Sequence, residues 1–229
     1  MTFIGPPKYF VYDCESTGIS VFEDRIVQFF GATADANGTL LDTWEFFINP
    51  GVPVPEGASD IHGFDDEFLA EKGGDPEVEL NGIKKLFLKH KDLIHVAFNM
   101  NYDLSILDAE MKRHGVSDNF GSWFSENGKL VDGLVIDRHR DKFRKGKRNL
   151  ETQAKHYGVE FDPDAAHNAL YDTEVTAKVT VKILEEFGIP TTREQAQWQE
   201  AWRSNFESYL RKTDPVATVE RGWPLRERE

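Results

Sequence analysis

The chain lacks the features that would place it outside the cytoplasm or in a membrane. Its 229 residues contain one cysteine, so an internal disulfide is impossible. No run of about 18 apolar residues occurs, which argues against a membrane-spanning helix. The opening residues, MTFIGPPK, do not place a basic segment before an apolar one, as an export signal would. We therefore expect a cytoplasmic protein with no membrane partner.

Acidic residues outnumber basic ones, with 40 Asp and Glu against 27 Lys and Arg. The formal net charge of −13 disfavours a polyanionic partner, because long-range repulsion slows its approach. The stretch RHRDKFRKGKR at 138–148 reverses this balance locally, with seven basic residues against one aspartate. It is interpreted either as a solvated loop or as a guide for a substrate strand, with contacts from Arg144, Lys145, Lys147 and Arg148.

What the chain does contain is the pattern of an α/β fold. Apolar runs bounded by turn residues predict three antiparallel strands, followed by alternating helices and strands, hence a mixed sheet flanked by helices. The predicted strands are 9–16, 25–35, 40–49, 93–98 and 131–137, and the predicted helices are 77–90, one capped by Asn101, 150–157 and about 166–187.

After residue 190 the composition changes. Thr192 to Lys212 is predicted as an amphipathic helix with an aromatic stripe that includes Trp198, Trp202 and Phe206. We therefore divide the chain into a body, residues 1–190, and a helical tail, residues 191–229. The stripe indicates packing onto the body, or docking to a partner protein or a second copy.

Two carboxylates, Asp13 and Glu15, lie at the end of the first predicted strand. Side chains alternate in a strand, so these two project together while Cys14 points the other way and is expected to be a core residue. Taken alone, the pair is also compatible with a solvated strand end. Ionised groups near a core are costly unless they are paired or bind a metal.

Three further residues complete a candidate site. Asp103 opens a predicted helix, where an aspartate can also serve the helix dipole. Asp172 lies on the apolar side of the helix 166–187, where an unpaired carboxylate has no structural benefit. His167, five residues earlier, is a candidate general base in the loop or first turn. Four acids on three separate elements suit two hard divalent cations that activate water against a phosphodiester.

These residues closely resemble the DEDD superfamily of 3′-to-5′ exonucleases, on its histidine branch. The matching motifs are Asp13-Cys14-Glu15-Ser16-Thr17-Gly18, Asn99 to Asp103, and His167-Asn168-Ala169-Leu170-Tyr171-Asp172, with Ile61-His62-Gly63 and Asp137 as further elements. The match covers about residues 8 to 188. Asn168 disfavours the tyrosine branch of the superfamily.

The resemblance implies an RNase H-like exonuclease domain that releases 5′-mononucleotides from single-stranded or frayed 3′ ends. It implies two Mg²⁺ or Mn²⁺ ions held by Asp13, Glu15 and Asp172, with Asp103 acting through water and His167 as the general base. It also implies that His62 and residues Ser16, Thr17 and Gly18 hold the terminal nucleotide, next to Asn99. Phe98 stands where the family often has histidine, and core packing is preferred for it over stacking on a base.

Other functions stay open at this point. DNA is preferred over RNA as substrate because of the Ile-His-Gly element, and an exoribonuclease of the same fold is the alternative. Proofreading would require a DNA polymerase or other replication protein in trans. A non-catalytic nucleic-acid or polymerase-binding module would be expected to lack at least one of the acids, and a paired-carboxylate glycosidase would not need all of them.

Overall fold

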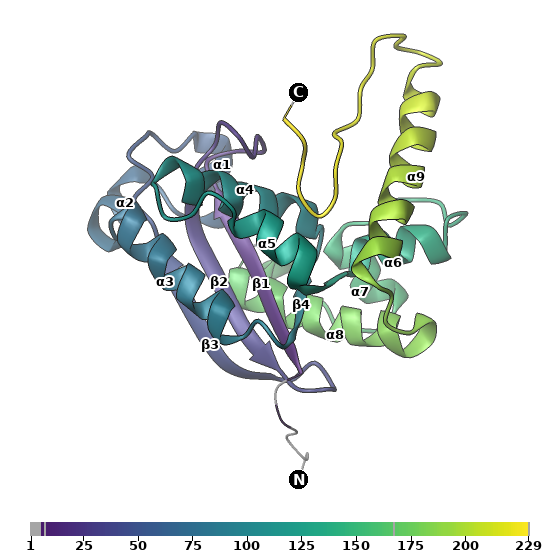
Figure 1. Ribbon diagram of the computed structural model, residues 1–229, viewed down its shortest axis with the longest axis horizontal. Helices are drawn as coiled ribbons and strands as arrows, with labels where there is room; N and C mark the ends of the chain where they lie inside the picture. Colours follow the sequence, from purple (N-terminus) through teal and green to yellow (C-terminus); the bar gives the residue numbers. More distant parts are fainter. Residues whose placement is uncertain (1–5, 7, 167, 229) are drawn as a thin grey trace.

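A computed structural model describes residues 6, 8–166 and 168–228. Five strands form one sheet in the order β3-β2-β1-β4-β5 (Figure 1). β1 pairs with β2, and β2 with β3, in antiparallel fashion, whereas β4 is parallel to both β1 and β5. The predicted mixed sheet is thereby confirmed. The strands are β1 (Tyr9–Ser16), β2 (Ile26–Ala34), β3 (Leu40–Phe47), β4 (Ile94–Ala97) and β5 (Lys129–Asp132).

Helices cover both faces of this sheet. In Figure 1, α3, α4 and α5 lie in front of the sheet and α8 crosses behind it. Within the described residues, no helix is both long and apolar enough to cross a membrane. The helices are α1 (Glu56–His62), α2 (Asp66–Lys72), α3 (Pro76–Lys89), α4 (Met100–Arg113), α5 (Phe120–Asn127), α6 (Gly133–Arg140), α7 (Leu150–His156), α8 (Ala169–Phe187) and α9 (Thr192–Leu210), with a 3₁₀ turn at Pro163–Ala165.

The alternation of β1 divides the core into two layers. Phe10, Tyr12 and Cys14 belong to the cluster formed with α3, α4 and α5, whereas Tyr9 and Val11 belong to the cluster formed with α6, α7 and α8. Cys14 is buried, as expected for a core residue. The same alternation directs the next two odd-numbered residues, Asp13 and Glu15, to the α8 side of the sheet.

The predicted strand at 131–137 is wrong beyond Asp132. There the chain enters α6, because the Asp132 carboxylate accepts hydrogen bonds from the backbone N–H groups of Leu134 (3.0 Å) and Val135 (3.4 Å) and so caps a helix. Asp137 consequently lies on a helix. A short apolar run such as Leu134 to Ile136 has no periodicity that separates a buried helix from a strand.

Two predicted helix starts also differ from the structure. The N-cap of α4 is Asn99, in the left-handed conformation (φ 67°), and Asn101 lies inside the helix. The Asn101 amide instead donates to the backbone carbonyl of Gly222 (2.9 Å), which holds the C-terminal segment against α4. The last body helix, α8, begins at Ala169, with Asn168 as its N-cap.

The tail packs on the body at the β5 edge of the sheet. The buried Gln195 amide donates to the carbonyl of Leu130 (2.7 Å) and accepts from the N–H of Asp132 (2.8 Å), as a neighbouring strand would. Beyond α9 the chain returns to the body, where the Trp223 side chain is buried and its indole N–H donates to Asp132 (3.4 Å). The tail therefore buttresses the elements that carry the candidate site.

Candidate active site

Three of the predicted acids converge between β1 and the first turn of α8. Asp13 and Glu15 point to the α8 side of the sheet, and Asp172 lies in the first turn of that helix. The charge of Asp172 acts on both strand carboxyls, and Asp13 and Glu15 also act on each other. All three side chains are partly exposed, so the group lies at the surface of the sheet end and not within the core.

The fourth acid reaches this group from the other side of β1. Asp103 is buried in the first turn of α4, and its carboxylate accepts a hydrogen bond from the backbone N–H of Cys14 (3.0 Å). Pairing between β1 and β4 ends at Val11, so this N–H lies beyond the β4 ladder. The hydrogen bond therefore completes the strand and fixes Asp103 beside Asp13.

The carboxyls of this cluster repel one another. Burial first, and then the charge of Asp172, raise the pKa of Asp13 from 3.8 to about 7. Burial and the charges of Asp13 and Asp172 raise the pKa of Glu15 from 4.5 to about 8. Burial and Asp13 also raise the pKa of Asp103 well above its usual value. Carboxylates that repel one another at a partly open site fit divalent cations, which take oxygen ligands and offset the repulsion between the carboxylates.

The loop after β1 is held by its own hydrogen bonds. The buried Thr17 hydroxyl donates to Asp24 (3.1 Å) and accepts from the N–H of Arg25 (3.0 Å). At Gly18, an added Cβ would lie 2.5 Å from an Asp24 carboxylate oxygen, so a side chain there would displace the Asp24 carboxylate that binds Thr17 and Ser20. Ser16 donates to the Gly18 carbonyl (2.7 Å). Thr17 and Gly18 therefore shape the loop, and its outer edge carries Ile19, which is 87% exposed.

His62 and Phe98 flank this loop region differently. His62 is buried at the end of α1, accepts from the Phe64 N–H through Nδ1 (3.1 Å) and stacks on the Phe64 ring. Burial lowers the pKa of His62, and the nearby Ser16 carbonyl opposes that shift. Phe98 is partly exposed and lies outside the three apolar clusters of the described residues, contrary to the preferred core position.

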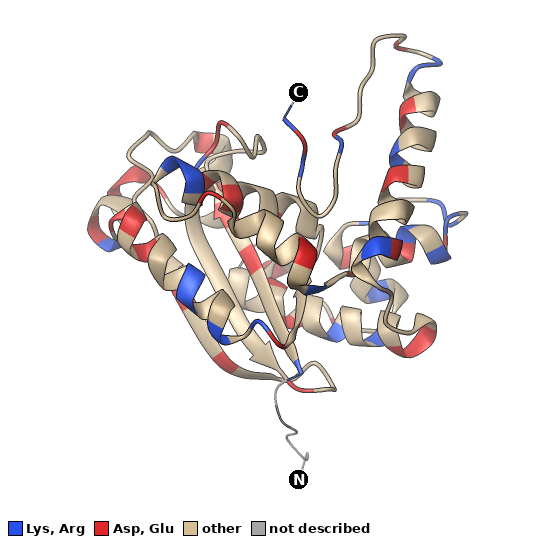
Figure 2. Ribbon diagram, viewed as in Figure 1, with Lys and Arg blue, Asp and Glu red and all other residues tan. Residues whose placement is uncertain are grey.

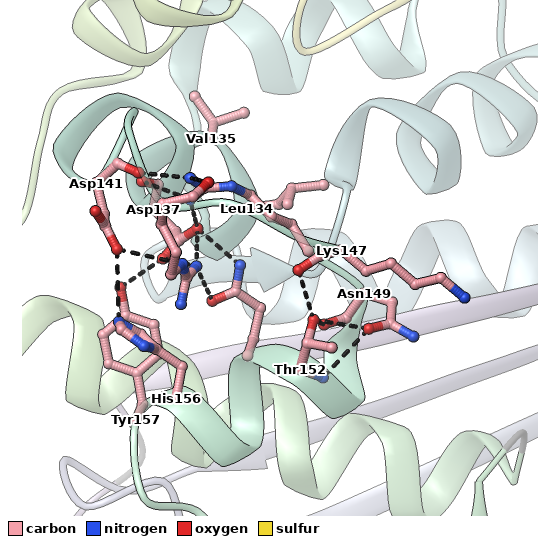
Figure 3. Close-up of polar contacts among 12 residues, drawn as sticks. Leu134, Val135, Asp137, Asp141, Lys147, Asn149, Thr152, His156 and Tyr157 are labelled. Atoms are coloured by element: carbon pink, nitrogen blue, oxygen red, sulfur yellow. Dashed lines mark hydrogen bonds and ion pairs between the residues drawn. The ribbon is translucent and has the colours of Figure 1, made fainter.

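A second polar cluster surrounds Asp137 (Figure 3). Asp137, Asp141 and His156 bring possible ligand atoms within 4.8 Å of one another. However, Asp137 is fully buried and bound by the guanidinium groups of Arg144 (2.6 Å) and Arg148. Burial would raise the pKa of Asp137, but hydrogen bonds from its neighbours and the charge of Arg144 lower it. This cluster is a buried ion pair network and does not need a metal.

The network changes the interpretation of the basic stretch. The Arg148 guanidinium also donates to the carbonyls of Asp141 (2.5 Å) and Arg144 (3.1 Å), so it ties the loop 141–149 to the end of α6. Arg144 and Arg148, two of the predicted substrate contacts, both form ion pairs with Asp137. Lys145 and Lys147 are exposed.

Comparison with known proteins identifies the family of this chain. Residues 10–180 match the family RNase_T, described as exonuclease. The chain therefore belongs to this exonuclease family of the DEDD superfamily. The PolC-type DNA polymerase III of Staphylococcus aureus is 33% identical over 180 residues, and that of Pediococcus pentosaceus is 28% identical over 179. These alignments cover 78% of the chain and 11% of each polymerase.

Solved structures of exonuclease I share the fold of this exonuclease domain. Exonuclease I from Methylocaldum szegediense has a TM-score of 0.65 at 20% identity, over 88% of this chain and 44% of that one. E. coli exonuclease I in complex with a dT13 oligonucleotide has a TM-score of 0.64 at 19% identity, over 90% of this chain and 46% of that one. The chain thus spans less than half the length of these neighbours.

The remaining expected site residue, His167, lies outside the described residues.

Two residues that the motifs did not indicate help to position the site of this exonuclease domain. The Tyr102 hydroxyl donates to the Gly18 carbonyl (2.7 Å) and contacts the Ser16 hydroxyl, which joins α4 to the loop after β1. The buried Asp132 carboxylate accepts from the N–H of Asn99 (3.2 Å), at the start of the helix that carries Asp103. An aspartate before Gly-Leu-Val is a helix-start signal that could have indicated Asp132, whereas Tyr102 has none.

Proposed function

We propose that this exonuclease domain hydrolyses the terminal phosphodiester at the 3′ end of single-stranded or frayed DNA and releases 5′-mononucleotides. The observation that carries this proposal is the convergence of Asp13, Glu15, Asp103 and Asp172 from three elements, where mutual repulsion adds to burial in raising the carboxyl pKa values of Asp13, Glu15 and Asp103. In the hydrolysis, a water oxygen attacks phosphorus, the bond from phosphorus to the 3′ oxygen breaks, and the shortened strand keeps a 3′ hydroxyl.

Two divalent cations, Mg²⁺ or Mn²⁺, would supply acidified water and neutralise the charge on the phosphate. Asp13, Glu15 and Asp172 would hold them, and Asp103 would contribute through water while fixing β1 by its bond to Cys14. His167, which directly precedes the N-cap residue of α8 in the sequence, would accept the proton of the attacking water.

The terminal nucleotide would lie against the loop after β1. Ser16, His62 and Asn99 offer polar contacts there, and the exposed Ile19 and partly exposed Phe98 offer apolar surface to a base. Thr17 and Gly18 act through the shape of the loop. Single-stranded DNA as substrate is supported by the fold shared with E. coli exonuclease I, whose solved complexes hold DNA oligonucleotides.

Incubation of the protein with 3′-labelled DNA and RNA single strands, with Mg²⁺ or EDTA, tests this proposal. We expect labelled mononucleotides from DNA with Mg²⁺ and no product with EDTA. Asp172→Ala should remove nearly all activity without unfolding the protein. Glu174→Ala, two residues further along the same helix, is the matched control. Degradation of RNA alone would indicate an exoribonuclease, and wild-type activity of folded Asp172→Ala would refute the site.

The PolC-type relatives favour a second aspect of the function. Their polymerases contain the region that resembles this chain, so we propose that the chain can act beside a DNA polymerase in trans. Removal of mismatched 3′ ends faster than matched ends from a primed template, in the presence of a polymerase, would support proofreading. Equal rates on both ends would refute it.

A further inference from the structure

A surface remote from the carboxylates combines exposed aromatic rings with cations. We call it the arm surface, and it consists of the end of α6, the loop 141–149 and the aromatic stripe of α9. Figure 1 shows α9 standing out from the body at the β5 side, with α6 at its base. The carboxylates, in contrast, lie where β1, α4 and the start of α8 meet.

The aromatic side chains of the α9 stripe stack on one another in sequence order. They recur at intervals of three and four, so they share one face of the helix. The rings of Trp202 and Phe206 lie 5.2 Å apart and within 18° of parallel, and those of Phe206 and Tyr209 lie 6.4 Å apart and within 13°. Phe206 is 39% exposed and Tyr209 64%, although such rings are normally covered.

The loop 141–149 presents a third exposed ring. Phe143 at its tip is 85% exposed, yet the base of the loop is fixed by Arg144 and Arg148 on the buried Asp137. An exposed phenylalanine on an anchored loop contributes nothing to the core. It is therefore positioned to contact something outside this chain.

Each part of the arm surface also carries positive charge. The guanidinium of Arg138 lies 3.9 Å from the centre of the Trp202 ring, and that of Arg140 5.1 Å from the Trp198 ring. Among the described residues, none of the following cations forms an ion pair with a carboxylate: Arg138, Arg140, Lys142, Lys145, Lys147 and Lys212. Figure 2 shows the basic segments of the loop beside α9.

Of the three carboxylates of α9, Glu194 accepts hydrogen bonds from Thr191 and also interacts with the charge of Arg140, whereas the other two are paired within the helix. Glu200 and Glu207 are bound by Arg203 (2.6 and 2.7 Å), and Arg211 also binds Glu207 (2.7 Å). The unpaired cations therefore stand out on a chain whose net charge is −13. Rings with π faces beside unpaired cations are what binds single-stranded nucleic acid without sequence preference, whereas a protein partner would not require so many free cations.

We propose that the arm surface binds the single-stranded part of a substrate whose 3′ end lies at the carboxylates, through phosphate contacts to its cations and base stacking on Phe143, Phe206 and Tyr209. This inference rests on the proposed exonuclease function and deepens it. Strand spacing places β5 about 10 Å from β1, and a packed helix adds about 10 Å. Phe206 lies a further ~16 Å along α9 from Gln195, which bonds to β5, at about 1.5 Å per residue. Even an extended single strand, at roughly twice the ~3.4 Å per nucleotide of a duplex strand, therefore needs about four nucleotides to join the two sites.

The first experiment compares dT20 and dT3 as substrates of the Phe206→Ala/Tyr209→Ala double variant. Both side chains are exposed, so their removal costs little packing. We expect the KM for dT20 to rise at least tenfold, with kcat changed less than twofold and dT3 hydrolysis unchanged within twofold, because dT3 cannot reach the arm. Leu88→Ala/Ile189→Ala, which also removes two exposed apolar side chains, is the matched control and should leave both substrates unaffected.

The second experiment tests the charge. Replacing Lys142, Lys145 and Lys147 by glutamine should reduce the slope of log KM for dT20 against log salt by about 2, because each lost contact to a single strand contributes about 0.7. The control replaces Lys85, Lys89 and Lys91, which are exposed on α3 and the turn after it, and should leave the slope unchanged.

Failure of the arm and failure of the exonuclease proposal give different results. Fluorescence anisotropy with labelled dT20 in EDTA measures binding without hydrolysis. Tight binding that both arm variants weaken tenfold supports the inference even if no product forms. Unchanged dT20 binding and KM in both variants, or an equal loss on dT3 and dT20, would overturn it.

Discussion

Asp13→Asn should abolish nuclease activity and at the same time stabilise the metal-free protein above neutral pH. The side chains are nearly isosteric, so the main change is the loss of one ionisable group. In the folded protein, burial and Asp172 raise the pKa of Asp13 from 3.8 to about 7. Because the folded pKa exceeds the unfolded one, the folded state binds more protons, and its stability falls as the pH rises through about 7.

The size of this effect follows from the pKa. One pKa unit corresponds to about 1.4 kcal/mol, so a shift from 3.8 to about 7 has a ceiling of about 4 kcal/mol. Asp13 is partly exposed and shares the repulsion with Glu15, so we expect about 2 kcal/mol from its neutralisation at pH 8. For a chain of this size, that raises Tm by about 4 to 8 °C.

Thermal unfolding in EDTA at pH 5 and pH 8 measures this prediction. The gain in Tm should be larger at pH 8, since at pH 5 the wild-type carboxyl is already protonated in the folded state. Addition of Mn²⁺ should reverse the order, because only the wild type keeps all its ligands. Asp92→Asn, in the exposed turn before β4, is the control. A Tm of Asp13→Asn that stays at or below wild type at pH 8 in EDTA would refute the electrostatic reasoning.

Three further predictions concern the supports of the site and its metals. Arg148→Ala should lower the free energy of unfolding by about 3 to 5 kcal/mol in urea, because it removes one of the two cations that neutralise buried Asp137, whereas Lys155→Ala, in an exposed ion pair, should cost at most about 1 kcal/mol. Equal effects would contradict the network. Gly18→Ala should reduce kcat at least tenfold, since its Cβ would lie 2.5 Å from a carboxylate oxygen, and Gly57→Ala, with no atom within 4 Å, should not. Calorimetric Mn²⁺ affinity should rise steeply from pH 6 to 8 as the two strand carboxyls, with pKa values of about 7 and 8, lose their protons, and a flat profile would exclude them as ligands.

The sequence was sufficient for those parts of the site that depend on local periodicity. The two-residue repeat of β1 correctly separated Asp13 and Glu15 from Cys14, and the helical pattern around Asp172 placed it on the side that packs on the sheet. The antiparallel pairing of β1, β2 and β3 was predictable as well, from the turn residues that bound the apolar runs.

Long-range contacts were not predictable in this way. Nothing in the basic stretch reveals that Arg144 and Arg148 are engaged by Asp137, because that pairing depends on the helix that replaced the expected strand. The link from Tyr102 to Gly18 joins residues 84 positions apart. Asn101 looked like a cap because its amide suits that role, but its tertiary partner lies at Gly222.

The side-chain amide of Gln195 has a consequence for any attempt to shorten this protein. It supplies to β5 the hydrogen bonds that would otherwise come from a sixth strand. A version truncated at residue 190 would leave that row of backbone groups bare, and bare rows recruit strands from other molecules. Such a fragment should form oligomers or precipitate at concentrations where the full chain stays monodisperse in light scattering.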